Sequence, residues 1–383
     1  MKSRRLKVAV IGLGSAGRLH CDSIVNSTPE MTLVAVVEAV EPLARAAAEK
    51  YGVPAFPAVR DLLKARICDA VTVATPHPSH PVIAIECMKA GLHVLTEKPL
   101  AETVGKADRM IRAAKAHRVA FGCVFQRRFE PAVARAIRLV RSGRLGALRR
   151  ALLVFTDFRS QAYYDSNAWR ATWKGEGGGV LLNQAPHFLD IFVQLAGTPE
   201  TVHGHIATAM HRIEVEDQAE ALLTYRGGGT GYVYCSTTEP RDSIRFEIVG
   251  ENGKLVLREK SLEFFAFRPG LKQLSDATAE MWAQPKVTEP NLAVASQETG
   301  HFSVMRNFAR HVLRGETLVC SGESALASLE LSNAITLSHF QDKAVRLPID
   351  RRAYDSLLGR LQRTSRFRKR RVRVQYATDP RLK

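Results

Sequence analysis

The chain has no hydrophobic run long enough to cross a lipid bilayer as a helix. Its 383 residues are 45% hydrophobic and 24% charged, a composition typical of globular proteins, and no apolar run approaches the roughly 18 to 20 residues that a spanning helix needs. The basic start precedes only the short run VAVIGLG (8–14), which ends in glycines and lacks an A-x-A cleavage site. We therefore expect a first strand here rather than a signal peptide, and a cytoplasmic protein with no membrane partner.

Cysteine and histidine form no pattern typical of a metal site. The six cysteines are scattered, with no C-x-x-C pair and no histidine cluster at zinc spacing. Free thiols in a reducing compartment are their expected state, and no metal is predicted. The cysteines are Cys21, Cys68, Cys87, Cys123, Cys235 and Cys320.

The sequence also lacks any DNA- or RNA-binding motif, although its formal net charge is +17. Residues 351–383 hold 12 Lys or Arg against 2 acids, so most of the excess charge lies in this basic C-terminal tail. The run RFRKRRVRV (366–374) suits an anionic surface. A solvated, partly disordered tail is the interpretation we favour, and a nucleic-acid partner is not expected.

The length exceeds that of one ordinary core and predicts two domains. In residues 1–126, short runs that are apolar throughout alternate with helical patterns, which indicates a parallel sheet covered on both faces. The expected strands are 7–14, 33–38, 69–76, 93–99 and 120–125, and the expected helices are 16–27, 41–52, 80–91 and 103–118.

Residues 127–350 have a different pattern. A helix over 131–143 is followed by runs that alternate polar and apolar residues and are joined by glycine turns, which predicts a mostly antiparallel sheet with one face buried. The segment 268–300 has little pattern and is expected to be a long excursion. The expected strands are 147–155, 201–212, 218–227, 229–237, 243–257 and 261–267, and the later helices are 301–315 and 322–340.

A G-x-G-x-x-G motif directly follows the first expected strand and opens a helix. Its glycines, Gly12, Gly14 and Gly17, permit a tight turn and close approach of the backbone to a pyrophosphate. Leu13, Ser15 and Ala16 complete the loop, and the helix start offers unpaired N–H groups to phosphate. Glu38 ends the second expected strand, where an acid binds the adenine ribose and repels a 2′-phosphate. The pattern predicts a Rossmann domain that binds NAD in preference to NADP.

The stretch GGGVLLNQAPHFLD (177–190) by itself fits a glycine loop leading into an ordinary core helix. Together with GLGSAGRLH (12–20), ATPHPSH (74–80) and EKPLA (97–101), however, it resembles the Gfo/Idh/MocA oxidoreductase family. The resemblance extends over nearly the whole chain, through QRRFEPAV (126–133), FEIVGENGKLVL (246–257) and SLELSNAITLS (328–338).

This resemblance implies an α/β fold: an N-terminal Rossmann domain plus a C-terminal α+β domain whose large open sheet builds homodimers or homotetramers. It implies NAD(P)-dependent hydride transfer at a secondary alcohol, with Lys98 and His187 as the catalytic residues. Asn183 stands where many members have an acid. Further residues that the motifs place at the cofactor are Thr75, Pro76, His80, Glu97, Lys98 and Gln126.

These residue types suit alcohol oxidation. A histidine takes up a proton near neutral pH, and Lys98 can stabilise the developing alkoxide. Residues four apart on a helix share a face, so we expect Asn183 and His187 to point together at the nicotinamide, although Pro186 would interrupt that helix. Asp190 is expected to be structural.

Aromatic and basic residues upstream extend the candidate substrate site. Trp169 and Arg127 are the substrate contacts that we predict, beside Lys98, Asn183 and His187. Arg128 and Arg170 are further candidates for an anionic group, and Tyr163, Tyr164 and Trp173 for stacking on a sugar, with packing beneath a loop as an equal alternative for the aromatic residues.

The function predicted is an NAD-dependent dehydrogenase acting on a sugar, a sugar derivative or a cyclitol. Two alternatives remain open from the sequence. One is a redox-neutral glycosidase of the same family, in which retained NAD oxidises and is then reduced again. The other is a non-catalytic, cofactor-binding scaffold whose basic tail contacts nucleic acid.

Overall fold

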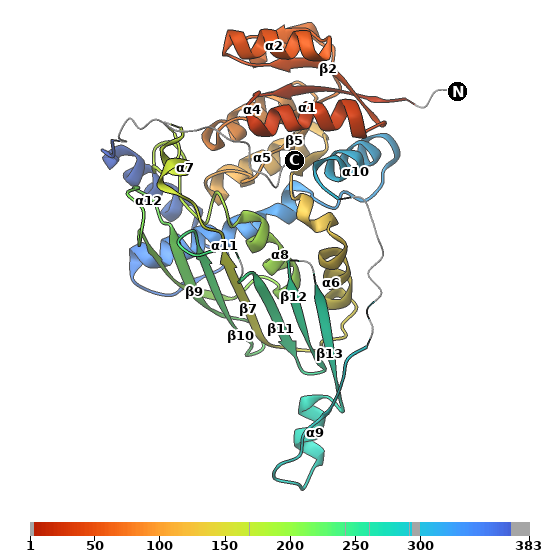
Figure 1. Ribbon diagram of the computed structural model, residues 1–383, viewed down its shortest axis with the longest axis vertical. Coiled ribbons are helices and arrows are strands. Elements are labelled where there is room, and N and C mark those ends of the chain that lie inside the picture. The colour runs from red at the N-terminus through yellow and green to blue at the C-terminus, as the bar shows by residue number, and fades with distance from the viewer. Residues whose placement is uncertain are drawn as a thin grey trace.

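A computed structural model describes residues 4–368, apart from residues 168, 242, 260, 291 and 293–298. Two sheets form its framework, one in each domain (Figure 1). None of the helices in this described part is long and apolar enough to span a membrane. The same residues contain no group of three or more His, Cys, Asp or Glu side chains that could hold a metal ion.

The first sheet has six parallel strands in the order β3-β2-β1-β4-β5-β6. Its strands are almost entirely buried, as the continuous apolar runs predicted, because helices cover both faces. The strands are β1 (Leu6–Ile11), β2 (Met31–Val37), β3 (Ala55–Phe56), β4 (Ala70–Val73), β5 (His93–Thr96) and β6 (Phe121–Cys123). The helices are α1 (Ser15–Ser27), α2 (Glu41–Tyr51), α3 (Val59–Ala65), α4 (His80–Lys89) and α5 (Val104–His117).

The second sheet has nine strands in the order β14-β13-β12-β11-β7-β10-β9-β8-β15. Only the β7–β10 pair is parallel among its described pairs, so the sheet is mostly antiparallel, as predicted. The strands are β7 (Leu148–Thr156), β8 (Thr201–Ala207), β9 (Gln218–Thr224), β10 (Thr230–Ser236), β11 (Arg245–Gly250), β12 (Gly253–Arg258), β13 (Leu262–Arg268), β14 (Lys286–Thr288) and β15 (Val345–Arg346).

Strand β8 ends at Ala207, so it is shorter than the strand over 201–212 that the sequence pattern predicted. The carboxylate of Asp217 accepts the backbone N–H groups of Ala209, Met210 and His211, which turns the chain away from the sheet. The expected excursion over 268–300 contains α9 (Leu271–Ala277) and β14, and α9 projects beyond the end of the sheet (Figure 1).

Helices cover one face of the second sheet and join it to the first domain (Figure 1). Helix α11 (Gly322–Gln341) packs on β8, on α8 (Pro186–Ala196) and on α5, and the amide of its buried Asn333 bonds to Val104 N and Glu102 O of the first domain. The helices not yet described are α6 (Pro131–Arg141), α7 (Gln161–Asp165), α10 (His301–Arg314) and α12 (Arg351–Thr364), with short 3₁₀ turns at His77–Ser79 and Gln126–Phe129.

Two helices near the C-terminal end of the chain, α10 and α12, pack at positions that the sequence did not predict. Helix α10 packs against α1, and its Val304, Met305 and Phe308 belong to the core of the first domain. Helix α12 forms the first part of the region predicted to be a partly disordered tail. It begins at a cap in which Asp350 accepts Arg352 N and Ala353 N, and it buries Tyr354, Leu357 and Leu358. Residues 369–383, with most of the predicted basic run, lie outside the described residues.

Candidate active site

The carboxyl ends of β1, β4 and β5 converge at the glycine-rich loop. Gly12 follows β1 with a φ of +88°, and a Cβ on it would lie 2.8 Å from Ala74 O. A Cβ on Gly17 would lie 1.8 Å from Gly12 O, so this glycine lets α1 pack closely against the turn. Gly14, by contrast, caps α1 and has no atom within 4 Å of where its Cβ would be. The open space at this helix start fits the phosphates of a dinucleotide.

Glu38 lies beside this loop at the end of β2. Its carboxylate accepts Leu13 N at 2.8 Å and Val40 N at 3.0 Å. A carboxylate has about four acceptor positions, so Glu38 keeps capacity for ribose hydroxyls. Its place fits the ribose-binding acid of a Rossmann domain.

The loops after β4 and β5 support one another. His80 places its two ring nitrogens 2.7 Å from Thr75 O and 3.0 Å from Pro99 O. A neutral imidazole can donate to only one of these carbonyls, and burial lowers the pKa of His80. Thr75 also accepts a hydrogen bond from Ser79 Oγ at 2.7 Å, next to Pro76. The His80 side chain therefore holds the predicted cofactor loops together.

Glu97 is buried directly before Lys98. His20 Nε2 donates to its carboxylate at 2.8 Å, and His301 Nε2 lies 3.9 Å from the same oxygen. Burial opposes ionisation of Glu97, but the hydrogen bond and charge of His20 outweigh it and lower the pKa of this carboxyl. The sequence motifs did not indicate that His20 and His301 lie in the candidate site. His20 lies within the GLGSAGRLH motif, whereas His301 has no local signal because it arrives on α10.

Lys98 and His187 form the centre of the candidate site. Lys98 Nζ donates to Asn183 O at 2.7 Å, and burial lowers the pKa of this ammonium group. His187 packs its ring edgewise on Phe125, with 5.6 Å between ring centroids. Burial, then the charges of Lys98 and Arg127, hold the pKa of His187 well below its usual value. The lowered pKa keeps the ring neutral near pH 7, and its Nδ1 is buried with no hydrogen-bond partner within the described structure.

The position of Asn183 corrects the sequence interpretation. Helix α8 begins at Pro186, so Asn183 lies in the turns before it, and the two residues do not share a helical face. Pro186 therefore starts a helix instead of interrupting one. The turns form because Glu216 accepts Gly179 N at 2.8 Å and Leu181 N at 3.1 Å. The main-chain oxygen of Asn183, and not its amide, contacts Lys98.

A buried acid, Glu176, stands behind Asn183 and was missed. Its Oε1 accepts the Asn183 amide, its Oε2 accepts Ala171 N at 2.6 Å, and its main-chain oxygen accepts His77 Nδ1 at 3.3 Å. The only sequence signal was an isolated acid within KGEGGG (174–179). This contact anchors the turn that carries Asn183.

The aromatic candidates fall into two groups. Trp169 and Tyr163 are half-buried at the site: the guanidinium of Arg170 lies 5.0 Å from the Trp169 ring and 4.2 Å from the Tyr163 ring. Tyr164 and Trp173, in contrast, belong to the core of the second domain, so they pack beneath the loop and do not offer a ring for stacking on a sugar.

The candidate arginines Arg127 and Arg128 have different surroundings. Arg128 forms a buried two-point ion pair with Asp190 at 2.7 and 2.5 Å and also bonds to Val319 O, so it is structural and not a substrate contact. Arg127 lies over the Phe188 ring at 4.8 Å and close enough to His187 for its charge to lower that pKa. Nearby, Gln126 Oε1 is buried with no partner in the described residues, an acceptor placed to meet a ligand.

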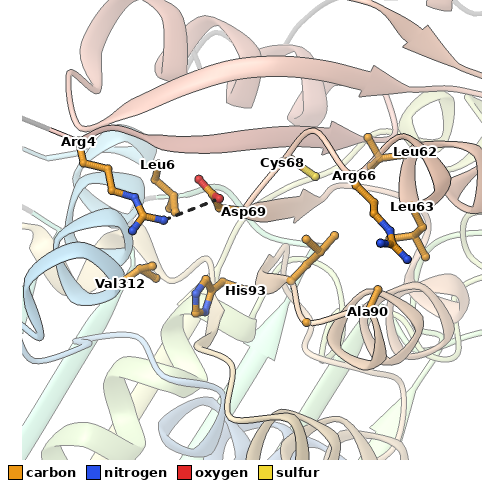
Figure 2. Close-up of a pocket in the computed structure, with 12 residues that line it drawn as sticks. Arg4, Leu6, Leu62, Leu63, Arg66, Cys68, Asp69, Ala90, His93 and Val312 are labelled. Atoms are coloured by element: carbon orange, nitrogen blue, oxygen red, sulfur yellow. Dashed lines mark ion pairs between the residues drawn. The ribbon is translucent and has the colours of Figure 1, made fainter.

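A separate cavity of about 550 Å³ opens at the opposite edge of the parallel sheet, where the strands begin (Figure 2). Two of its polar side chains have partners in the fold: Asp69 accepts Lys7 N at 3.0 Å, and His93 accepts Ala120 N at 2.9 Å. Ligands of open α/β sheets bind at the carboxyl ends of the strands, so this cavity is not the active site.

Two family models match the chain. Residues 6–125 match the oxidoreductase family with an NAD-binding Rossmann fold, and residues 133–256 match the Gfo/Idh/MocA C-terminal domain. The chain belongs to the Gfo/Idh/MocA oxidoreductase family. It is an oxidoreductase of CH–OH donors, with an NAD-binding first domain.

Relatives with assigned activities include inositol dehydrogenases. The scyllo-inositol 2-dehydrogenase (NAD(+)) of Bacillus subtilis is 25% identical over 92% of this chain and 99% of its own. The inositol 2-dehydrogenase of Rubrobacter xylanophilus is 33% identical over 66% of this chain and 71% of its own. Among solved structures, the WlbA dehydrogenase from Bordetella pertussis in complex with NADH and UDP-GlcNAcA is 27% identical, covers 91% of this chain and 100% of its own, and has a TM-score of 0.77.

Proposed function

We propose that the protein transfers hydride between a secondary alcohol of a sugar, a sugar derivative or a cyclitol and the nicotinamide of NAD, with Lys98 and His187 as its catalytic residues. The observation that carries the assignment of residues is the buried, unpartnered Nδ1 of His187 within the described structure, next to the buried ammonium group of Lys98. The large majority of buried side-chain polar atoms in folded proteins have a hydrogen-bond partner, so an unbonded ring nitrogen favours a functional role for His187.

The cofactor would be held by the glycine loop, Glu38 and Gln126, and it supplies the acceptor for hydride. His187 is neutral at pH 7 because its pKa is depressed, so it can accept the proton of the substrate hydroxyl. Lys98 has three donors and uses one on Asn183 O, which leaves donors for the substrate oxygen as negative charge develops on it.

Glu38 supports a preference for NAD. Its carboxylate touches the glycine loop at Leu13 N, so a 2′-phosphate on the ribose would meet a negative charge. Ser15, Ala16, Thr75, Pro76, His80 and Glu97 complete the proposed cofactor surface.

The substrate class follows from the site and the relatives. The proposed contacts are Trp169, Arg127 and Asn183 beside the catalytic pair. Trp169 offers a half-buried ring and Arg127 a cation near His187, and both suit a polyhydroxylated ring with or without an acidic group. Inositol dehydrogenation by two relatives agrees with this class.

We also propose a cytoplasmic homodimer or homotetramer built through the open sheet. On the face of that sheet away from the helices, Leu222 of β9 is 62% exposed and lies opposite Tyr232 of β10. An exposed apolar side chain on the open face of this sheet supports contact with a second copy of the same face.

The test is a screen of NAD reduction across aldoses, uronic acids, inositols and sugar nucleotides. We expect NADH to accumulate in proportion to oxidised product for at least one polyol. Turnover of a glycoside without net NADH would instead indicate the redox-neutral glycosidase, and no turnover of any polyol would contradict the proposal.

A further inference from the structure

A second pocket lies beside the loop of the substrate site. It has a volume of about 610 Å³ and is formed where the chain leaving α12 passes the turn that follows Trp169. Its lining residues are Thr172, Lys174, Gly175, Ser365, Arg366, Phe367 and Arg368.

One carboxylate fixes both walls of this pocket. Glu214 Oε2 accepts Trp173 N from the loop at 2.9 Å and Ser365 Oγ from the C-terminal segment at 2.8 Å. Because a single oxygen bonds to both segments, residues 365–368 are held against the loop.

The pocket is strongly basic. Lys174, Arg366 and Arg368 are exposed at its rim, and no ion pair engages any of them within residues 4–368 as described. Among the residues that the structure describes, Glu214 is the only acid bonded to a lining side chain, and its Oε2 already accepts two hydrogen bonds.

We infer that this pocket binds the phosphate groups of a small molecule and thereby fixes the loop of the substrate site. Arginine guanidinium groups match phosphate oxygens with two parallel hydrogen bonds. The volume falls within the ~300–1,000 Å³ of small-ligand sites. A nucleic acid would need a basic surface that follows a long backbone, whereas these cations surround one pocket.

The loop connects this pocket to the catalytic residues. Thr172 and Gly175 line the pocket, while Trp169 in the same loop packs its ring 5.4 Å from that of His77. Glu176 comes next in the chain and accepts the amide of Asn183. A phosphate that ordered the loop would therefore act on the turn that contacts Lys98.

The binding test uses the full chain with saturating NAD, so that the glycine loop is already occupied. Calorimetric titration with inorganic pyrophosphate should show saturable binding that weakens as salt rises. The double variant Arg366→Gln/Arg368→Gln should lose about tenfold or more in affinity, because two charge-assisted contacts are removed. Arg363→Gln is the matched control, since Arg363 is exposed on α12 but does not line the pocket, and it should stay within about twofold of the wild type.

Three results would overturn the inference: no saturable binding by the wild type, equal affinity of the double variant, or an equal loss in Arg363→Gln. Tighter binding of a single-stranded oligonucleotide that the double variant abolishes would assign the segment to nucleic acid instead. None of these readouts needs turnover, so they stand or fall separately from the proposed dehydrogenase activity.

Kinetic measurements distinguish two sources of the bound phosphate, which are the substrate and a separate effector. If the phosphate belongs to the substrate, pyrophosphate should raise the KM of a sugar nucleotide and leave that of a phosphate-free polyol unchanged. If it belongs to a separate effector, the kinetic constants of both substrates should change. Unchanged constants for both would contradict the link to the loop.

Discussion

Lys98 Nζ donates a 2.7 Å hydrogen bond to the main-chain oxygen of Asn183, and this contact joins the two domains at the candidate active site. The lysine follows β5 of the parallel sheet, and the asparagine belongs to the glycine-rich turns before α8. The geometry of the site thus depends on how the second domain presents a backbone carbonyl to the first.

Replacing Lys98 or His187 with alanine should remove most turnover. Acid–base groups contribute ~100- to 10,000-fold to rates, and losses of that order in kcat are expected for each variant. NAD binding, followed by fluorescence or calorimetry, should remain measurable. Near-normal turnover in either variant would show that the residue is assigned wrongly.

The pH profile should reflect the depressed pKa of His187. The histidine accepts a proton only when neutral, so the acidic limb of kcat/KM for oxidation should lie below the usual histidine range. Arg127→Gln removes a positive charge that lowers this pKa, so the limb should move to higher pH. A limb that does not move, or that moves to lower pH, would contradict the assignment of His187 as the base.

Glu38→Ala should relax the preference for NAD. The change removes both the ribose acceptor and the repulsion of a 2′-phosphate, so NAD affinity should fall and NADP affinity should rise. Dissociation constants of both cofactors, measured for wild type and variant, check this. Equal affinities of the wild-type protein for the two cofactors would refute the prediction.

Gly14 and Gly17 form a matched pair. Alanine at Gly14 meets no atom within 4 Å and suits its φ of −60°, so Gly14→Ala should fold normally but lose about tenfold or more in NAD affinity by filling the phosphate space. Alanine at Gly17 would meet Gly12 O at 1.8 Å, so Gly17→Ala should lower the free energy of unfolding by roughly 1–3 kcal/mol. Urea titrations and NAD binding separate the two effects, and identical behaviour of the variants would argue against the loop geometry.

Asn183→Asp should destabilise the site, because it places a second carboxylate against buried Glu176 and removes its donor. We expect a loss of roughly 1–3 kcal/mol in unfolding free energy. The double variant with Glu176→Gln should recover much of it, since that amide can donate to the new carboxylate and still accept Ala171 N. If the double variant is no more stable than Asn183→Asp alone, charge repulsion is not the cause.

Much of this molecule follows from local sequence. Apolar runs between helical patterns indicated the parallel sheet, and the three glycines indicated the loop at its carboxyl edge, because both depend on short-range geometry. The predictions that failed concern residues whose positions depend on contacts with distant parts of the sequence. The four-residue spacing of Asn183 and His187 suggested one helix, but Glu216, far along the chain, bonds to Gly179 and Leu181 and holds the segment in turns.

His301 and Glu176 are two further residues whose positions the local sequence did not predict. His301 reaches Glu97 only because α10 packs on α1, a contact with no trace in the residues around it. Glu176 carries no motif of its own, yet its buried carboxylate bonds to the Asn183 amide and to Ala171 N in the candidate site. The sequence pattern did not predict helix α12, because its three buried side chains lie among many arginines.

The place of α10 has a consequence for how the protein is made. Val304, Met305 and Phe308 complete the core of a domain whose strands were all synthesised before residue 126. During translation the nucleotide-binding half therefore emerges with an open apolar surface, which is closed only after strands β7 to β14 of the second sheet have been synthesised. A fragment ending at residue 126 would carry that surface permanently and would be prone to aggregate.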